Sequence, residues 1–252
     1  MQGLARTHNR DMPGTANRPA TSTHPFAAVI FDADGTLIDS EVPGLDVIHQ
    51  VAASQGLHMN RDEAHERFRG IQMADVVAWF ASALPQADDA FIRNLPQHIR
   101  TRMAARFREG LNPMPGAWQL LNNLTVPHCV ATNGPPEKVS LTLALSGLAD
   151  RFGDHVYSAY EVGSFKPEPG LFLHAAHSLC VAPQDCAVVE DSLPGVQAGV
   201  AAGMHVFALL PPDSLPSHWH QQVTPIADLY ALDALLHPLS SGRSPITDKK
   251  IE

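Results

Sequence analysis

The chain has 252 residues, of which 44% are apolar and 17% charged, and its formal net charge is −9. This length fits one large domain or two modest ones, and the apolar content excludes a chain that is disordered throughout. The acidic balance argues against a nucleic-acid partner, and no apolar run is long enough to suggest a membrane partner. The negative net charge does not exclude a small anionic substrate, because a bound metal ion can make the electrostatic field at a site positive.

The three cysteines, Cys129, Cys180 and Cys186, form no CxxC pair and are odd in number. We therefore expect free thiols, a reducing interior and a cytoplasmic location rather than a disulfide framework. Each cysteine lies in an apolar segment, which predicts that all three are buried.

The two ends of the chain differ in composition from the rest. Residues 1–25 are polar and lack the apolar stretch of a secretory signal, so we expect a disordered tail there. Residues 238–252 predict a second tail.

Short apolar runs that end in polar residues recur along the chain, and each predicts a buried strand. They cover residues 27–34, 127–132, 186–191 and 205–210. Helical patterns lie between them, often with proline near the start and glycine just past the end. They cover residues 115–124, 135–146, 168–180 and 194–202. Strands that alternate with helices predict an α/β fold with a parallel sheet and helices on both faces.

Residues 42–110 do not follow this alternation and predict an all-helical insert directly after the first strand. A helical pattern runs over 43–56, and two more run over 72–84 and 88–109. Pro96 is expected to kink or split the last of these helices.

A further helix of the insert is marked at both ends. Asn60 is followed three residues later by Glu63, which is the spacing of a capping box. We expect this helix to stop at Gly70.

Polar side chains follow three of the predicted strands at the point where each strand ends. They are Asp32 and Asp34, Thr132 and Asn133, and Glu190 and Asp191. Ligands of an open parallel sheet bind beyond the carboxyl ends of its strands, so we expect these residues to share one site. Four carboxylates cannot all stay ionised close together without a cation, and their hard oxygens suit Mg²⁺.

An aspartate beside Mg²⁺ can attack phosphorus and form an aspartyl phosphate. Asp32 and Asp34 are two residues apart, with Gly35 just beyond, so both carboxylates can face one pocket. One of them would then attack while the other transfers protons. An Asp-X-Asp pair alone is weak evidence, but its place after an apolar strand and before Gly-Thr-Leu strengthens it.

Four segments resemble the signature motifs of the haloacid dehalogenase-like hydrolases. They are FDADGTLIDSE at 31–41, ATNGPPEK at 131–138, SFKPEP at 164–169 and VVEDSLPGVQAG at 188–199. They occur in the family order, and the resemblance covers about residues 26–232. It implies a doubly wound, Rossmann-like core of residues 26–41 and 111–237, with a helical cap at 42–110.

The resemblance also implies a role for each matching residue. Asp32 matches the nucleophile, and Asp34 matches the general acid and base, which also donates its backbone carbonyl to Mg²⁺. Lys166 matches the lysine that neutralises the charge of the nucleophile and the phosphate. Asp191 matches a metal ligand, and Glu190 lies among the metal ligands or directly behind them.

For the phosphoryl group, the resemblance implies binding by the Thr132 hydroxyl and by the backbone N–H groups of Asn133 and Gly134. Dehalogenases of the family resemble FDxYG at the first motif and phosphonatases FDxAG, whereas this chain has Asp34 there. An aspartate fits phosphate-ester chemistry, because the leaving oxygen needs a proton.

Two alternatives to a phosphatase stay open. Phosphosugar mutases of the family have histidine at the position of Gly44 and arginine at that of Met73, so this sequence argues against a mutase. A phospho-acceptor such as a signalling receiver, or an idle binding protein, is the other alternative. A receiver needs no helical cap, and the intact Asp pair, Lys166 and Asp191 argue against an idle site.

Among capped members, three segments resemble bacterial enzymes of the 6-phosphogluconate phosphatase type. They are RFRGIQM at 67–73, PGAWQLLNNLTVPHCVATNGP at 115–135 and KPEPGLFLHAAHSL at 166–179. The resemblance implies a Mg²⁺-dependent phosphatase for a small phosphate ester, such as a sugar or sugar-acid phosphate. Arg69, just before Gly70, either belongs to a solvated arginine face or reaches into the cleft to hold the substrate.

Overall fold

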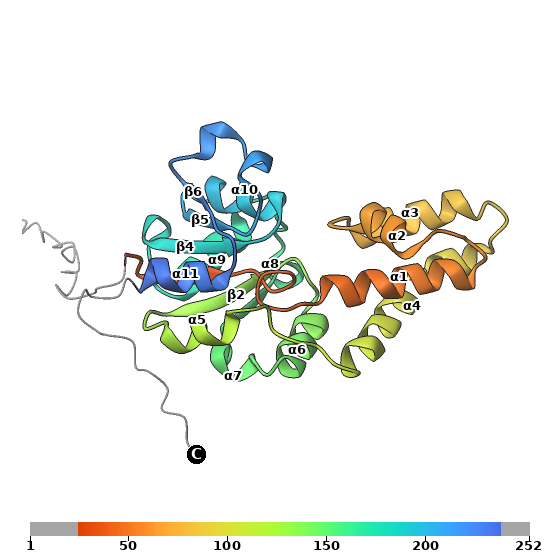
Figure 1. Ribbon diagram of the computed structural model, residues 1–252, viewed down its shortest axis with the longest axis horizontal. Helices are drawn as coiled ribbons and strands as arrows, with labels where there is room; N and C mark the ends of the chain where they lie inside the picture. Colours follow the sequence, from red (N-terminus) through yellow and green to blue (C-terminus); the bar gives the residue numbers. More distant parts are fainter. Residues whose placement is uncertain (1–24, 238–252) are drawn as a thin grey trace, which may run out of the picture.

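The computed structural model describes residues 25–237 (Figure 1). The tail expected at 238–252, and all but the last residue of the one expected at 1–25, lie outside the described residues. The strands are β1 (Ala28–Phe31), β2 (His128–Thr132), β3 (Val156–Ser158), β4 (Cys186–Glu190), β5 (His205–Ala208) and β6 (Val223–Pro225).

The helices form two groups along the chain. The first group is α1 (Glu41–Ser54), α2 (Arg61–Phe68), α3 (Met73–Ala83) and α4 (Asp89–Arg108). The second is α5 (Ala117–Asn123), α6 (Pro136–Leu145), α7 (Ala149–Phe152), α8 (Ala159–Val162), α9 (Gly170–Ser178), α10 (Leu193–Ala201) and α11 (Leu229–Leu236). Figure 1 shows the first group to one side of the sheet and the second around it.

The six strands form one sheet in the order β3-β2-β1-β4-β5-β6, and every neighbouring pair is parallel. The chain builds the sheet outward from β1 to β3 and then returns to start the other half at β4. The strand order therefore reverses between β1 and β4, where Phe31 pairs with Val189. In doubly wound folds this switch point is where ligands bind.

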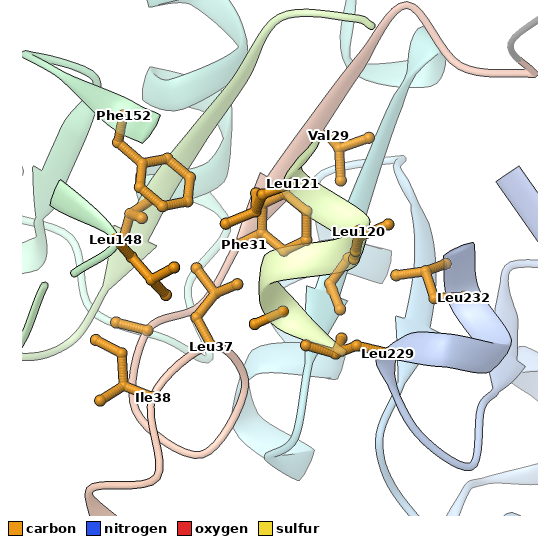
Figure 2. Packing of buried hydrophobic residues seen from close by; sticks show 14 of the residues in the cluster. Val29, Phe31, Leu37, Ile38, Leu120, Leu121, Leu148, Phe152, Leu229 and Leu232 are labelled. Carbon is orange, nitrogen blue, oxygen red and sulfur yellow. The ribbon is translucent and has the colours of Figure 1, made fainter. Parts of the chain in front are cut away.

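β1 is buried along its whole length, and its side chains alternate between the two faces of the sheet. Val29 and Phe31 lie in one apolar cluster with residues of α5, α7 and α11 (Figure 2). Ala28 and Ile30 lie in a second cluster with residues of α9 and α10. Helices therefore cover both faces of a parallel sheet, which confirms the predicted α/β, Rossmann-like fold class.

Helices α1–α4 bury an apolar cluster of their own, with Leu45, Phe68, Phe80 and Ile99 among its members. Two segments connect them to the sheet, and these run side by side. The Met114 N–H donates to the Leu37 carbonyl at 2.8 Å, and the Asp39 N–H donates to the Asn112 carbonyl at 3.0 Å. The helical group thus joins the sheet at a point a few residues after β1.

The helix signals in this group have mixed outcomes. The Asn60–Glu63 capping box is confirmed, with each side chain bonded to the other residue's backbone N–H. Of the kink or split predicted at Pro96, the split is wrong, because α4 runs through this residue. Leu95 and Ile99 on either side of Pro96 are buried in the same cluster, so tertiary packing holds both halves.

The thiols are free as expected, but one of them is not buried. Cys129 and Cys186 lie inside strands of the sheet, whereas Cys180 is exposed. Cys180 follows the end of α9 in a left-handed conformation, with φ 56°, so its side chain leaves the apolar face of the helix. None of the described helices combines the length and apolar character that a membrane span requires.

Candidate active site

Asp32 is the first residue after β1, at the carboxyl edge of the sheet. Its N–H donates to the Val189 carbonyl at 3.0 Å, so the backbone of Asp32 is still held against β4. The residue is 7% exposed. Asp32 therefore stands at the switch point between β1 and β4, with little freedom to move.

The chain turns sharply after Asp32. The Leu37 and Ile38 N–H groups both donate to the Ala33 carbonyl, at 2.9 and 3.0 Å, and Gly35 has a φ of 81°. A side chain at Gly35 would place its Cβ 2.1 Å from Asp191 Oδ2. This position needs glycine for its backbone conformation and for the close approach of Asp191.

After this turn, the Asp34 carboxylate accepts hydrogen bonds from two side chains, one just before α1 and one on α6. Ser40 Oγ donates to Asp34 Oδ1 at 2.5 Å, and Lys138 Nζ on α6 donates to Asp34 Oδ2 at 2.8 Å. Burial would raise the pKa of Asp34, but Lys138 and Ser40 outweigh it and hold this pKa below its usual value. Asp34 is therefore a carboxylate in this arrangement.

Lys166 connects the ends of β1 and β4. Its ammonium lies 2.5 Å from Asp32 Oδ1 and 2.6 Å from Glu190 Oε1, and the residue is 4% exposed. Burial acts to lower the pKa of Lys166, but Asp32 and Glu190 raise it above its usual value, so the ammonium stays charged. Asn133 holds the Lys166 backbone, since its side chain accepts from the Lys166 N–H and donates to its carbonyl.

Glu190, the last residue of β4, has both carboxylate oxygens engaged. Oε1 accepts from Lys166, and Oε2 accepts from the Ser192 N–H at 2.9 Å and the Ser192 hydroxyl at 2.8 Å. Ser192 is also the N-cap of α10, where its Oγ accepts from the Gly195 N–H. Glu190 is also fully buried, and its Oε1 holds the ammonium of Lys166 in place.

Asp32, Glu190 and Asp191 bring carboxylate oxygens within 4.8 Å of one another. Burial, with Glu190 nearby, raises the pKa of Asp32 to about 7 although Lys166 opposes this. Burial and the neighbouring carboxylates of Asp32 and Glu190 raise the pKa of Asp191 to about 8. One lysine does not balance these three carboxylates, two of which are buried, so the donor set fits a hard divalent cation.

The end of β2 and the loop after it carry the residues expected to bind phosphate. Thr132 is buried, and its Oγ accepts from the Gly134 N–H at 3.0 Å. The Gly134 carbonyl accepts from Ser158 Oγ at 2.7 Å, which ties this loop to the end of β3. The Asn133 side chain bonds to the Lys166 backbone, so the loop joins the predicted phosphate-binding residues to Lys166.

Arg69 lies at the C-terminal end of α2 and contacts the start of α1. Its Nη1 donates to Glu41 Oε2 at 2.5 Å, and the Arg69 side chain is 56% exposed. Glu41 directly follows Ser40, whose hydroxyl contacts Asp34. Gly70 has a φ of 69° with open space around its Cα, so the turn after Arg69 relies on its conformational freedom.

Sequence reasoning missed four polar residues of this site: Thr36, Ser40, Lys138 and Ser192. Thr36 Oγ1 donates to Asp191 Oδ1 at 3.0 Å, and the other three make the contacts given above. Lys138 had a usable signal, because residues 111–237 contain few lysines and arginines. Ser192 had the signal of an N-cap before a proline. Nothing in the local pattern distinguishes Thr36 and Ser40 from other turn residues.

Comparison with known proteins agrees with the motifs. The family model of the haloacid dehalogenase-like hydrolases matches residues 26–203. The 6-phosphogluconate phosphatase of Escherichia coli strain K12 is 31% identical over 209 residues, 82% of this chain and 93% of that protein. Hexitol phosphatase A of the same strain is 33% identical over 192 residues, 74% of this chain and 84% of that protein.

Among solved structures, a HAD family hydrolase of Deinococcus radiodurans R1 with bound phosphate and sodium is similar in fold and sequence. Its TM-score is 0.68 at 30% identity, with 85% of this chain and 96% of that chain covered. The family model spans most of the described residues, and the residues that match its motifs meet at one edge of the sheet. The chain belongs to the haloacid dehalogenase-like hydrolase family.

Proposed function

We propose that this enzyme is a Mg²⁺-dependent phosphatase that hydrolyses a small phosphorylated metabolite through a phospho-Asp32 intermediate. The observation that supports this most is the placement of Asp32 at the switch point, with one oxygen on Lys166 and Asp34 held close by on the next turn. The two relatives described above are named as phosphatases of a sugar acid and of hexitols. We therefore propose a sugar or sugar-acid phosphate, with 6-phosphogluconate as one candidate.

In the first step an oxygen of Asp32 attacks phosphorus in line with the ester bond. Asp34 is a carboxylate in the free enzyme, so it first takes up a proton from solvent when the substrate binds. The phosphorus–oxygen ester bond then breaks, and the leaving oxygen takes the electron pair and this proton from Asp34, which releases the alcohol. Lys166 stabilises negative charge on the transferring phosphoryl group. The Thr132 hydroxyl and the N–H groups of the following loop orient that group.

In the second step water hydrolyses phospho-Asp32. Asp34, as the carboxylate, takes a proton from the water whose oxygen attacks phosphorus, and the bond between phosphorus and the Asp32 oxygen breaks. Inorganic phosphate leaves and Asp32 returns to its free form. The sum is one phosphate ester and one water converted to one alcohol and one phosphate.

We propose that the Asp32 and Asp191 carboxylates and the Asp34 backbone carbonyl hold Mg²⁺. When bound, the ion supplies positive charge that stabilises the phosphoryl oxygens and orients them for attack. Both oxygens of Glu190 are already engaged, so we place Glu190 directly behind the ligands, where it positions Lys166.

Asp32, Asp34, Thr132 and Lys166 meet only the phosphoryl group and the ester oxygen, so recognition of the far end of the leaving group falls to the helical cap. We propose that Arg69, next to Gly70, supplies a guanidinium for an acidic or hydroxylated substrate. Gly44 and Met73 stand where phosphosugar mutases of the family have a histidine and an arginine. They supply neither a base nor a positive charge, which argues against a mutase. The free thiols support our proposal of a cytoplasmic location.

A screen of phosphorylated metabolites, with Mg²⁺ or with excess chelator, tests the proposed function. We expect release of inorganic phosphate with Mg²⁺ and none with chelator. Asp32→Asn should lower kcat at least about 1,000-fold, because the amide cannot form the intermediate, and circular dichroism should show an intact fold. Wild-type rates in Asp32→Asn would rule out the covalent mechanism, and no phosphate release from any ester would rule out the phosphatase.

A further inference from the structure

Lys138 is a positively charged residue of the candidate active site. The family motifs imply no role for it. It lies in the first turn of α6, and its ammonium is 2.8 Å from Asp34 Oδ2. The Lys138 side chain is 34% exposed, in contrast to 3% for Lys166. A ligand that reaches Asp34 can therefore also reach Lys138.

The other basic side chains of residues 111–237, histidines aside, do not compete for this role. Lys166 is buried and committed to Asp32 and Glu190. The backbone of Arg151 contacts the side chain of His128, the first residue of β2, at the end of the sheet opposite the site. Among the lysines and arginines of this part of the chain, Lys138 is the one that is both partly exposed and bonded to Asp34.

The ammonium of Lys138 has donors to spare. A lysine carries three N–H donors, and among the described residues Asp34 is its hydrogen-bond partner. The aliphatic stem passes over the loop after β2, since a Cβ at Gly134 would lie 3.9 Å from Lys138 Cδ. The side chain thus spans the phosphate-binding loop and ends beside the proton-transferring carboxylate.

The place of Lys138 limits which part of a substrate it can bind. To protonate the leaving oxygen, Asp34 must come within about 2.6–3.2 Å of it. The Lys138 ammonium is bonded to the Asp34 carboxylate, so it lies close to the ester oxygen as well. It can therefore contact groups on the first carbons of the leaving group. A carboxylate attached through one carbon has its oxygens only three bonds of about 1.5 Å from the ester oxygen.

We propose that Lys138 is a specificity-determining residue that binds an anionic group next to the phosphoester. The preferred substrates then include phosphate esters of 2-hydroxy acids, in which the carbon that bears the ester oxygen also bears a carboxylate. This inference rests on the proposed phosphatase function. It differs from the role proposed for Arg69, which lies in the cap and would bind the far end of a longer substrate.

The test compares two substrate pairs, in each of which a carboxylate replaces a hydroxymethyl group. The near pair is 2-phosphoglycolate and 2-hydroxyethyl phosphate, and the far pair is 6-phosphogluconate and glucitol 6-phosphate. Wild type should favour 2-phosphoglycolate over 2-hydroxyethyl phosphate at least 10-fold in kcat/KM. Lys138→Met and Lys138→Gln should each reduce this ratio about 10–100-fold, because a charged hydrogen bond is lost.

The same two variants should leave the kcat/KM ratio of the far pair unchanged. Glu137→Gln, an exposed neighbour on the same helical turn, is the matched control and should change neither ratio. Equal losses on both members of the near pair would mean that Lys138 only positions Asp34, and would overturn the proposal. So would a wild-type enzyme without the near-pair preference, or a change confined to the far pair. Failure of wild type on every ester would instead refute the phosphatase.

Discussion

Asp32 and Asp34 are neighbours in sequence with opposite electrostatic surroundings. Burial beside Glu190 raises the pKa of Asp32, whereas Lys138 and Ser40 keep the pKa of Asp34 low despite burial. The residue that we propose attacks phosphorus, Asp32, is thus the one whose charged form the protein alone disfavours. A cation between Asp32 and Asp191 would favour the attacking carboxylate.

Gly35→Ala should damage the metal site as well as stability. The left-handed φ of Gly35 costs an alanine about 1–2 kcal/mol, and the new Cβ would overlap Asp191 Oδ2 and displace it. We expect the Mg²⁺ concentration for half-maximal activity to rise at least about 10-fold. Activity measured as a function of Mg²⁺ concentration, together with chemical denaturation, checks both effects.

Gly203→Ala is the control for this prediction. Gly203 has a φ of 74°, and a Cβ at this position would have no atom within 4 Å, so the backbone strain is matched without the overlap. We expect a similar loss of stability and an unchanged Mg²⁺ requirement. If Gly35→Ala also kept the wild-type requirement, Asp191 would not be a metal ligand.

At the scale of elements, α1 and α2 are joined by a polar contact. Asp46 of α1 accepts from Arg61 Nε at 2.7 Å, and His65 Nε2 lies 2.8 Å from the same oxygen. The bond from Arg61 lowers the pKa of Asp46, partial burial opposes this, and His65 lowers it further. This contact supports the packing of α2, whose own apolar face is short.

The lowered pKa of Asp46 sets a pH dependence. A carboxyl group with a folded-state pKa below its unfolded value of about 3.9 contributes stability above that pH, which is lost as the pH falls through the folded pKa. Asp46→Asn should therefore lower Tm by about 1–3 °C at pH 7, a small effect because Arg61 is largely exposed. The difference from wild type should shrink below about pH 4.

Thermal unfolding of both proteins between pH 7 and pH 3.5 measures this difference. Asp154→Asn, at an exposed aspartate in a turn, should follow wild type over the whole range. A difference for Asp46→Asn that stayed constant down to the lowest pH would show that the charge of Asp46 is not what stabilises α2.

At the scale of the whole molecule, we propose that recognition of the far end of a substrate depends on Arg69 of the helical group. Arg69→Ala should lower kcat/KM about 10–100-fold for a sugar-acid phosphate, through loss of hydrogen bonds to the carboxylate. It should barely change hydrolysis of p-nitrophenyl phosphate, which has no carboxylate. Steady-state kinetics on the two substrates check this.

Arg67→Ala is the matched control for Arg69. The Arg67 guanidinium lies over the Trp79 ring, 5.7 Å from its centroid, and so packs within the helical group. We expect no change of preference between the two substrates. Equal losses on both substrates in Arg69→Ala would assign Arg69, through Glu41, to the support of the helices rather than to the substrate.

The sequence by itself determined the fold class and most elements of the sheet. β1, β2, β4 and β5 lie within predicted apolar runs, because a strand buried on both faces is apolar at nearly every position between its ends. β3 and β6 were not predicted, because each has only three residues and lies at an edge of the sheet. So short a segment shows no periodicity, and its pairing depends on the neighbouring strand.

The acidic residues at strand ends were also predictable, because motif and strand end coincide there. Only the tertiary structure decided which distant side chains meet. Lys138 reaches Asp34 across 104 residues of sequence, and Thr36 reaches Asp191 across 155. Local patterns report burial and helix ends, whereas such contacts follow from the strand order and from the turn at Gly35. The contacts that Lys138, Ser192 and the Asn133 side chain make are therefore visible only in the folded chain.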